Sequence, residues 1–149
     1  MNPVSMLAAH SGDWRGSNTL HDPNTGQSEE SPSTVTVTPI LNGRFVRIDY
    51  TWGYRGQPQE GSLLIGFNAK SNEVSGHWID TWHMGHAALN CLGSPGEIVI
   101  VRGSYPAPDG PDWGWRIEIE PQAETLRIRH TNIDSEGDEY PAVEGVYSR

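Results

Sequence analysis

The chain of 149 residues contains a single cysteine, Cys91. One cysteine cannot form an internal disulfide, and its rarity is typical of a reducing compartment, so we expect a cytoplasmic protein. A chain of this length can bury a core without covalent support, and we expect one domain spanning residues 1–149.

Basic residues are also scarce. Ten Lys and Arg residues stand against 19 Asp and Glu, the formal net charge is −9, and no basic cluster occurs. Nucleic acids and anionic membranes are bound through basic patches, so we expect neither as a partner. No apolar run approaches the roughly 18 residues that span a bilayer. The N-terminal segment lacks the basic start and long apolar region of a signal peptide.

Aromatic residues are abundant by contrast, with six Trp and five Tyr. Side chains of this kind either fill a core or line an apolar pocket. Their positions along the predicted strands therefore decide which of the two uses applies.

The dipeptide Asn42-Gly43 is the strongest hairpin signal in the chain, because both central positions of a type I′ turn need a positive φ. Folding the chain there pairs Pro39 with Val46, Val37 with Ile48, Val35 with Tyr50, Thr38 with Arg47 and Thr36 with Asp49. The first three pairs form an apolar face and the last two a polar face. This alternation is typical of a half-buried antiparallel sheet.

The rest of the chain reads as strand after strand. A short helical stretch is expected over 3–11, followed by strands at 13–20, 33–41, 44–53, 61–68, 73–82, 87–92, 96–105, 113–120, 124–133 and 139–148. Short strands at this spacing, separated by turn residues, predict an all-β sandwich or an up-and-down barrel.

Two further hairpins place the candidate site residues. Pairing Glu120 with Thr125 sets Trp115 opposite His130, so His130 and Asn132 continue an inward, apolar face. Pairing Phe67 with Val74 turns Trp78, Asp80 and Trp82 inward and His77, Thr81 and His83 outward. Inward positions are Val35, Val37, Ile48, Tyr50, Trp115, Ile117, Leu126, Ile128 and His130, and outward ones Thr36, Asp49, Glu118 and Arg127.

Several segments in this order resemble a lipocalin-like family known as domain of unknown function 1579. They are Gly12-Asp-Trp-Arg-Gly16, Leu41-Asn-Gly-Arg-Phe-Val46, Glu60-Gly61, Leu64-Ile-Gly-Phe-Asn68 and Trp78-Ile-Asp80. The resemblance implies an antiparallel calycin-type barrel of eight to ten strands around an interior cavity, and it implies no activity. The Gly-x-Trp-x-Gly opening is also similar to nitrobindin-like haem barrels, although Ser17-Asn-Thr19 departs from their glycine-rich continuation.

His130 and Asp80 are the two candidate catalytic residues, and each has more than one interpretation. An inward imidazole serves as a ligand anchor, a general base, a haem ligand or a hydrogen-bonded core residue. A carboxylate on an aromatic inner face needs a partner such as His130 or a tyrosine hydroxyl, or its pKa rises.

The histidines at 77, 83 and 86 suggest a metal site, but their spacing argues against it. His77 and His83 lie six residues apart on a strand, roughly 20 Å at about 3.3 Å per residue. They cannot both bind one ion through bonds of about 2 Å. His83 and His86 converge only if Met84-Gly85 forms a turn, and no third ligand is evident. We therefore expect no metal site.

Three functions remain open. The first is binding of a small apolar or amphipathic ligand inside the barrel, in a cavity bordered by Tyr50, Trp52, Trp78, Asp80, Trp115, His130 and Asn132. The second is an enzyme that uses Asp80 and His130 as an acid–base pair on a small hydrophobic substrate. The third is a haem protein with His130 as axial ligand, haem being the one cofactor considered. The sequence does not determine the oligomeric state, and a homodimer is one option.

Overall fold

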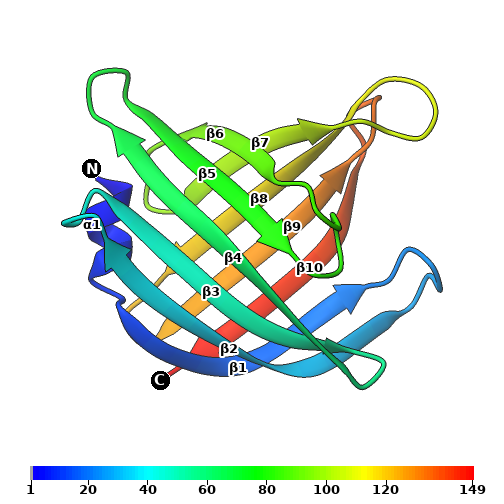
Figure 1. Cartoon of the computed structure of the whole chain (residues 1–149), viewed down its shortest axis with the longest axis horizontal. Coiled ribbons are helices and arrows are strands. Elements are labelled where there is room, and N and C mark those ends of the chain that lie inside the picture. The colour runs from blue at the N-terminus through cyan, green and yellow to red at the C-terminus, as the bar shows by residue number, and fades with distance from the viewer. Residues whose placement is uncertain (1) are drawn as a thin grey trace.

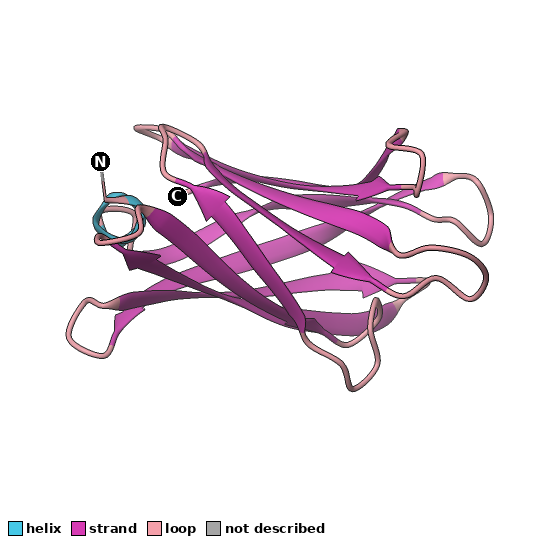
Figure 2. Ribbon diagram, turned by 90° about the horizontal axis from the view of Figure 1, so that it is seen from above, coloured by secondary structure: helices cyan, strands magenta, loops and turns pink. Residues whose placement is uncertain are grey.

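A computed structural model describes residues 2–149 and confirms the all-β prediction. One short helix, α1 (Pro3–Ala8), precedes ten antiparallel strands that form a closed barrel (Figures 1 and 2). The strands are β1 (Gly12–His21), β2 (Ser28–Ile40), β3 (Phe45–Tyr54), β4 (Gln57–Asn68), β5 (Glu73–Asp80), β6 (Leu89–Ser94), β7 (Val99–Tyr105), β8 (Trp113–Pro121), β9 (Thr125–Ile133) and β10 (Glu139–Ser148).

Each strand pairs with its neighbours in sequence, and β1 pairs with β10 to close the barrel. This is an up-and-down meander, which leaves no open sheet edge. Within residues 2–149, no helix is long and apolar enough to cross a membrane.

The first hairpin has the predicted register, with Val37 opposite Ile48 and Val35 opposite Tyr50. The turn is wider than two residues, however. Leu41, Asn42 and Gly43 all have positive φ, at 51°, 58° and 78°. The strands end at Ile40 and resume at Phe45, so Leu41 belongs to the turn rather than to β2.

The second hairpin corrects the predicted register by two residues. Trp115 lies opposite Asn132, and His130 lies opposite Ile117. A shift of two keeps every side chain on its face, because strand side chains alternate with period two. The nine residues given above as inward are accordingly buried, apart from Tyr50, which is partly buried. Of the four given as outward, Thr36 and Arg127 are exposed, and Asp49 and Glu118 are partly buried.

The third hairpin is confirmed up to Asp80, with Phe67 opposite Val74, Leu63 opposite Trp78 and Gly61 opposite Asp80. Strand β5 ends at Asp80, two residues earlier than predicted. The chain then leaves the sheet as a loop over 81–88, and this changes where the next side chains lie.

Helix α1 covers one end of the barrel (Figure 1). Asn2 caps it by accepting hydrogen bonds from the backbone N–H of Val4 and Ser5 at 2.9 and 3.2 Å, and Val4 and Leu7 are buried in the core. Beside the helix, the Trp14 ring is 1% exposed and its Nε1–H donates to the His10 carbonyl at 2.9 Å. This end is closed by apolar packing with its polar atoms satisfied.

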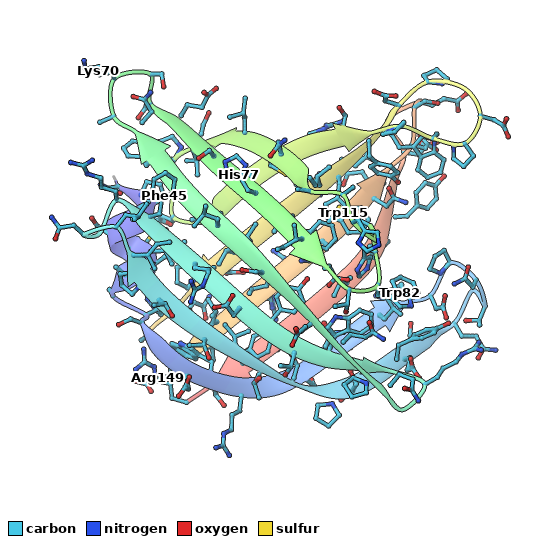
Figure 3. The ribbon with its side chains drawn as sticks, in the orientation of Figure 1. Phe45, Lys70, His77, Trp82, Trp115 and Arg149 are labelled. Atoms are coloured by element: carbon cyan, nitrogen blue, oxygen red, sulfur yellow. The ribbon has the colours of Figure 1, made fainter. Side chains whose placement is uncertain are left out.

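The opposite end is the mouth of the barrel, which we define by the loops 22–27, 55–56, 81–88, 106–112 and 134–138. Figure 3 shows Trp82 and Trp115 at this end and Phe45 at the other, beside α1. All of the candidate site residues that the structure brings together lie in the half of the barrel toward the mouth.

Candidate functional site

Three side-chain positions form one row across β3, β4 and β5. Tyr50 pairs with Gly61, and Gly61 pairs with Asp80. Because Gly61 has no side chain, the Tyr50 ring crosses β4 and its hydroxyl donates to Asp80 Oδ2 at 2.5 Å. The same hydroxyl accepts a hydrogen bond from Trp78 Nε1–H at 2.7 Å. The row fixes a carboxylate inside an aromatic wall.

Asp80 remains ionised although it is only 5% exposed. Its Oδ1 accepts the backbone N–H groups of Trp82 and His83 at 2.7 and 3.0 Å. Burial alone would raise the pKa of Asp80. The hydrogen bond from His83, the charge that this ring carries when protonated, and the hydrogen bonds from the Tyr50 hydroxyl and the Trp82 amide outweigh burial and hold the pKa at about 2. This carboxylate therefore accepts hydrogen bonds and donates none.

His83 points into the barrel, so its predicted outward orientation is wrong. Because Oδ1 of Asp80 binds two successive amides, the chain bends sharply after β5 and returns His83 to the interior. Its Nδ1 lies 3.0 Å from the same Oδ1, and its side chain is 11% exposed. An ionised carboxylate can only accept, so Nδ1 carries the proton. Nε2 of His83 is buried and has no hydrogen-bond partner.

His130 is held in one tautomer by Trp115. The indole Nε1–H donates to His130 Nδ1 at 3.0 Å, and an indole N–H is a donor only, so the His130 proton sits on Nε2. Burial, together with the charge that His83 carries when protonated, lowers the pKa of His130 from 6.5 to about 3, although Asp80 acts in the opposite direction. His130 is thus a neutral N–H donor at neutral pH.

Two hollows lie against His83. A cavity of about 20 Å³ is lined by Asn18, Tyr50, Trp52, Trp78, Asp80, His83, Ile128, His130, Val143, Gly145 and Tyr147. A cleft of about 330 Å³ at the mouth is lined by Leu20, His21, Pro23, Trp82, His83, Trp113, Trp115, Asn132, Tyr140, Pro141 and Ala142. His83 is the one described residue in both linings.

The structure divides the predicted site residues between these two spaces. Five of them, namely Tyr50, Trp52, Trp78, Asp80 and His130, line the inner cavity, and two, Trp115 and Asn132, line the mouth cleft. Trp78 and Trp115 stack at 5.2 Å and 16°, which joins the two groups. No hydrogen bond links Asp80 to His130 among the described residues; the carboxylate contacts His83 and the Tyr50 hydroxyl instead.

Sequence reasoning missed several residues that line the two spaces, among them Asn18, Trp82, His83, Trp113 and Tyr140. His83 could have been found by treating Asp80 as a possible turn residue, since aspartate commonly bonds the amides two and three residues ahead. Asn18, Trp113 and Tyr140 belong to strands whose relative placement only the closed barrel gives.

The interior does not fit a haem. Pockets for cofactors and drug-sized ligands occupy roughly 300–1,000 Å³, whereas the cavity that His130 shares with Asp80 and His83 measures about 20 Å³. The His130 lone pair at Nδ1 is also taken by Trp115. Within residues 2–149, no group of three or more His, Cys, Asp or Glu side chains is arranged to hold a metal ion.

The chain belongs to the family described as protein of unknown function (DUF1579), whose model matches residues 2–149. Among solved structures it is similar to Rv2717c from M. tuberculosis, with a TM-score of 0.66 over 98% of this chain and 96% of that one. The two share 13% sequence identity, so this likeness shows the fold alone. No curated protein matches the chain.

Proposed function

We propose that this protein is a calycin-type barrel that binds a small amphipathic molecule at its mouth, with the apolar body in the cleft and the polar end at His83. The cleft volume of about 330 Å³ lies at the lower end of the range for small-ligand sites. Three Trp rings and Tyr140 line it, and no Asp, Glu, Lys or Arg does.

The observation that carries the proposal is the buried, unpartnered Nε2 of His83. A buried polar atom without a hydrogen bond costs about 1–3 kcal/mol, and native structures contain few of them. The Asp80 carboxylate fixes the orientation of this imidazole. An oriented, unsatisfied acceptor next to an aromatic cleft supports a role in fixing a ligand rather than in stability.

Trp82 packs against the His83 ring at the mouth. It lies on the 81–88 loop, and its ring packs edge-on against His83 at 4.8 Å and 78°. A ligand that reaches Nε2 displaces part of this contact. We therefore expect binding to change the fluorescence of Trp82.

The neutral apolar dye N-phenyl-1-naphthylamine tests the cleft without a charged group. We expect saturable binding to one site, weakened at least about fivefold by Trp82→Ala, since an aromatic contact and its buried area contribute roughly 1 kcal/mol or more. The matched control is Phe45→Ala. Phe45 lies at the closed end of the barrel and lines a hollow of about 560 Å³ there. Equal weakening by both variants would show that the dye does not bind in the mouth cleft.

A second candidate function is general-base catalysis by His83, favoured by the Asp80–His83 geometry. A carboxylate on Nδ1 orients an imidazole and leaves Nε2 to take a proton, as in catalytic dyads and triads. This assignment replaces the Asp80/His130 pair. Its test is hydrolysis of p-nitrophenyl acetate, which should fall at least about tenfold in His83→Ala and remain unchanged in His77→Ala, on the outer face of β5. Equal rates in the three proteins would refute it.

A further inference from the structure

The inner cavity presents a defined set of hydrogen-bonding atoms. Asn18 Nδ2, a donor, is buried without a partner, and Asn18 is 4% exposed. When its ring is neutral, with the single proton on Nδ1 facing Asp80, His83 presents Nε2 as an acceptor. His130 contributes Nε2–H as a donor, because its Nδ1 is occupied by Trp115. All three residues line the same cavity of about 20 Å³.

This set selects a chemical group by elimination. An ammonium group only donates, so it cannot accept from Asn18 and His130. A carboxylate only accepts, so it cannot donate to His83. A hydroxyl group accepts two hydrogen bonds and donates one, which matches all three atoms. The space suits its size, since about 10–15 Å³ is enough for one water oxygen.

The charge at the mouth also disfavours an anion. The five mouth loops contain six carboxylates, Asp22, Asp109, Asp112, Asp134, Glu136 and Asp138, against one basic side chain, Arg55. A rim of this charge repels anions at distances up to a Debye length of about 8 Å in physiological salt.

Building on the proposed function, we infer that the ligand is a neutral apolar alcohol whose hydroxyl enters the inner cavity between Asn18, His83 and His130. The hydrocarbon part then occupies the mouth cleft. A water molecule has the same donor and acceptor pattern, so the ligand hydroxyl takes over hydrogen bonds that water can make.

Four probes of nearly equal shape test the inference by calorimetric titration of the intact protein at about pH 8. They are 2-phenylethanol, propylbenzene, phenylacetate and 2-phenylethylamine. We expect 2-phenylethanol to bind at least about tenfold tighter than the other three, because each of those leaves a buried polar atom unpaired.

If propylbenzene bound as tightly as 2-phenylethanol or more tightly, the hydroxyl site would be refuted, but the proposed binding in the apolar cleft would stand. Tighter binding of phenylacetate or 2-phenylethylamine would replace the alcohol by an anion or a cation. If none of the four probes bound, the proposed function would fail as well.

Two variants locate the hydroxyl. Asn18→Leu and His83→Leu should each lower the affinity for 2-phenylethanol to within about threefold of that for propylbenzene. His77→Leu is the matched control, because His77 is exposed on the outer face of β5, and it should change neither affinity. If both variants fold and still bind 2-phenylethanol more tightly than propylbenzene, the hydroxyl does not bind at Asn18 and His83. If neither variant folds, the ranking of the four probes on the native protein decides the inference.

Discussion

Gly61 is the position at which a single methyl group should dismantle the polar site. A Cβ atom at Gly61 would overlap the Tyr50 hydroxyl and Cζ, and would lie 2.8 Å from the Ile79 carbonyl oxygen. Backbone on one side and an aromatic ring on the other leave it no room. The Tyr50 ring has to leave β4, and its hydroxyl then loses both Asp80 and Trp78.

The magnitude follows from these two losses. Overpacking a tight interior costs about 1–3 kcal/mol. Loss of a hydrogen bond to a charged group costs about 1.5–3 kcal/mol more. We therefore expect Gly61→Ala to lower the free energy of unfolding by about 3–5 kcal/mol, measured by urea denaturation monitored by tryptophan fluorescence.

Gly53→Ala is the control in β3, the neighbouring strand. A Cβ there meets nothing closer than Ser31 Cβ at 3.6 Å, so its effect should stay within about 1 kcal/mol. In a Tyr50→Leu background, the cost of Gly61→Ala should fall to about 1–3 kcal/mol, because the hydrogen bond to Asp80 is already lost while the Ile79 carbonyl still crowds the Cβ. A small effect of Gly61→Ala in the native chain, or an unchanged effect in the Tyr50→Leu background, would refute the overlap as the cause.

Three further predictions concern stability. The pKa of His130 is about 3 in the folded protein and 6.5 without burial, so between these values the unfolded chain binds more protons. The free energy of unfolding should therefore decline by up to about 5 kcal/mol as the pH falls from 6.5 to 3. His130→Leu should remove most of this decline in urea titrations. The pKa of Asp80 is about 2 in the folded protein, below its ordinary value of 3.8. A further contribution of about 2 kcal/mol to the free energy of unfolding should therefore be lost as the pH falls from 3.8 to 2. Asp80→Asn should abolish this pH dependence. Leu41 is 66% exposed and has a φ of 51°, a backbone conformation that asparagine adopts more easily than leucine. Leu41→Asn should therefore stabilise the protein by about 0.5–1 kcal/mol in the same assay. A loss of stability would show that the Leu41 backbone is not strained.

The sequence predicted the fold well because its turns carry local chemistry. Asn42-Gly43 determines the first register through the positive φ of its residues, and alternation confirms it over several pairs. The turn at 122–124 contains no such signal, and the register of β8 and β9 came out two residues off. Alternation cannot detect a shift of two, since every side chain stays on its face.

The candidate site was harder to predict because its key side chain lies just beyond a strand. Continuing the alternation of β5 past Asp80 puts His83 outside, whereas the bonds of Asp80 to two amides reverse the chain. The same carboxylate therefore ends the strand and orients the imidazole. Period-two reasoning applies only while the ladder continues, and a polar residue on the inner face was the sign that it stops.

The two ends of the barrel use the same residue types in opposite ways. At the closed end, Trp14 donates its N–H to a backbone carbonyl, and the Arg149 guanidinium lies 4.5 Å from the centre of its ring. At the mouth, the aromatic rings surround a fixed carboxylate and leave buried polar atoms of Asn18 and His83 without partners. A barrel selected for stability alone would gain by replacing that cluster with apolar side chains of similar volume. The unsatisfied atoms of Asn18 and His83 lie in the half of the barrel toward the mouth, and this asymmetry supports a binding function for the mouth.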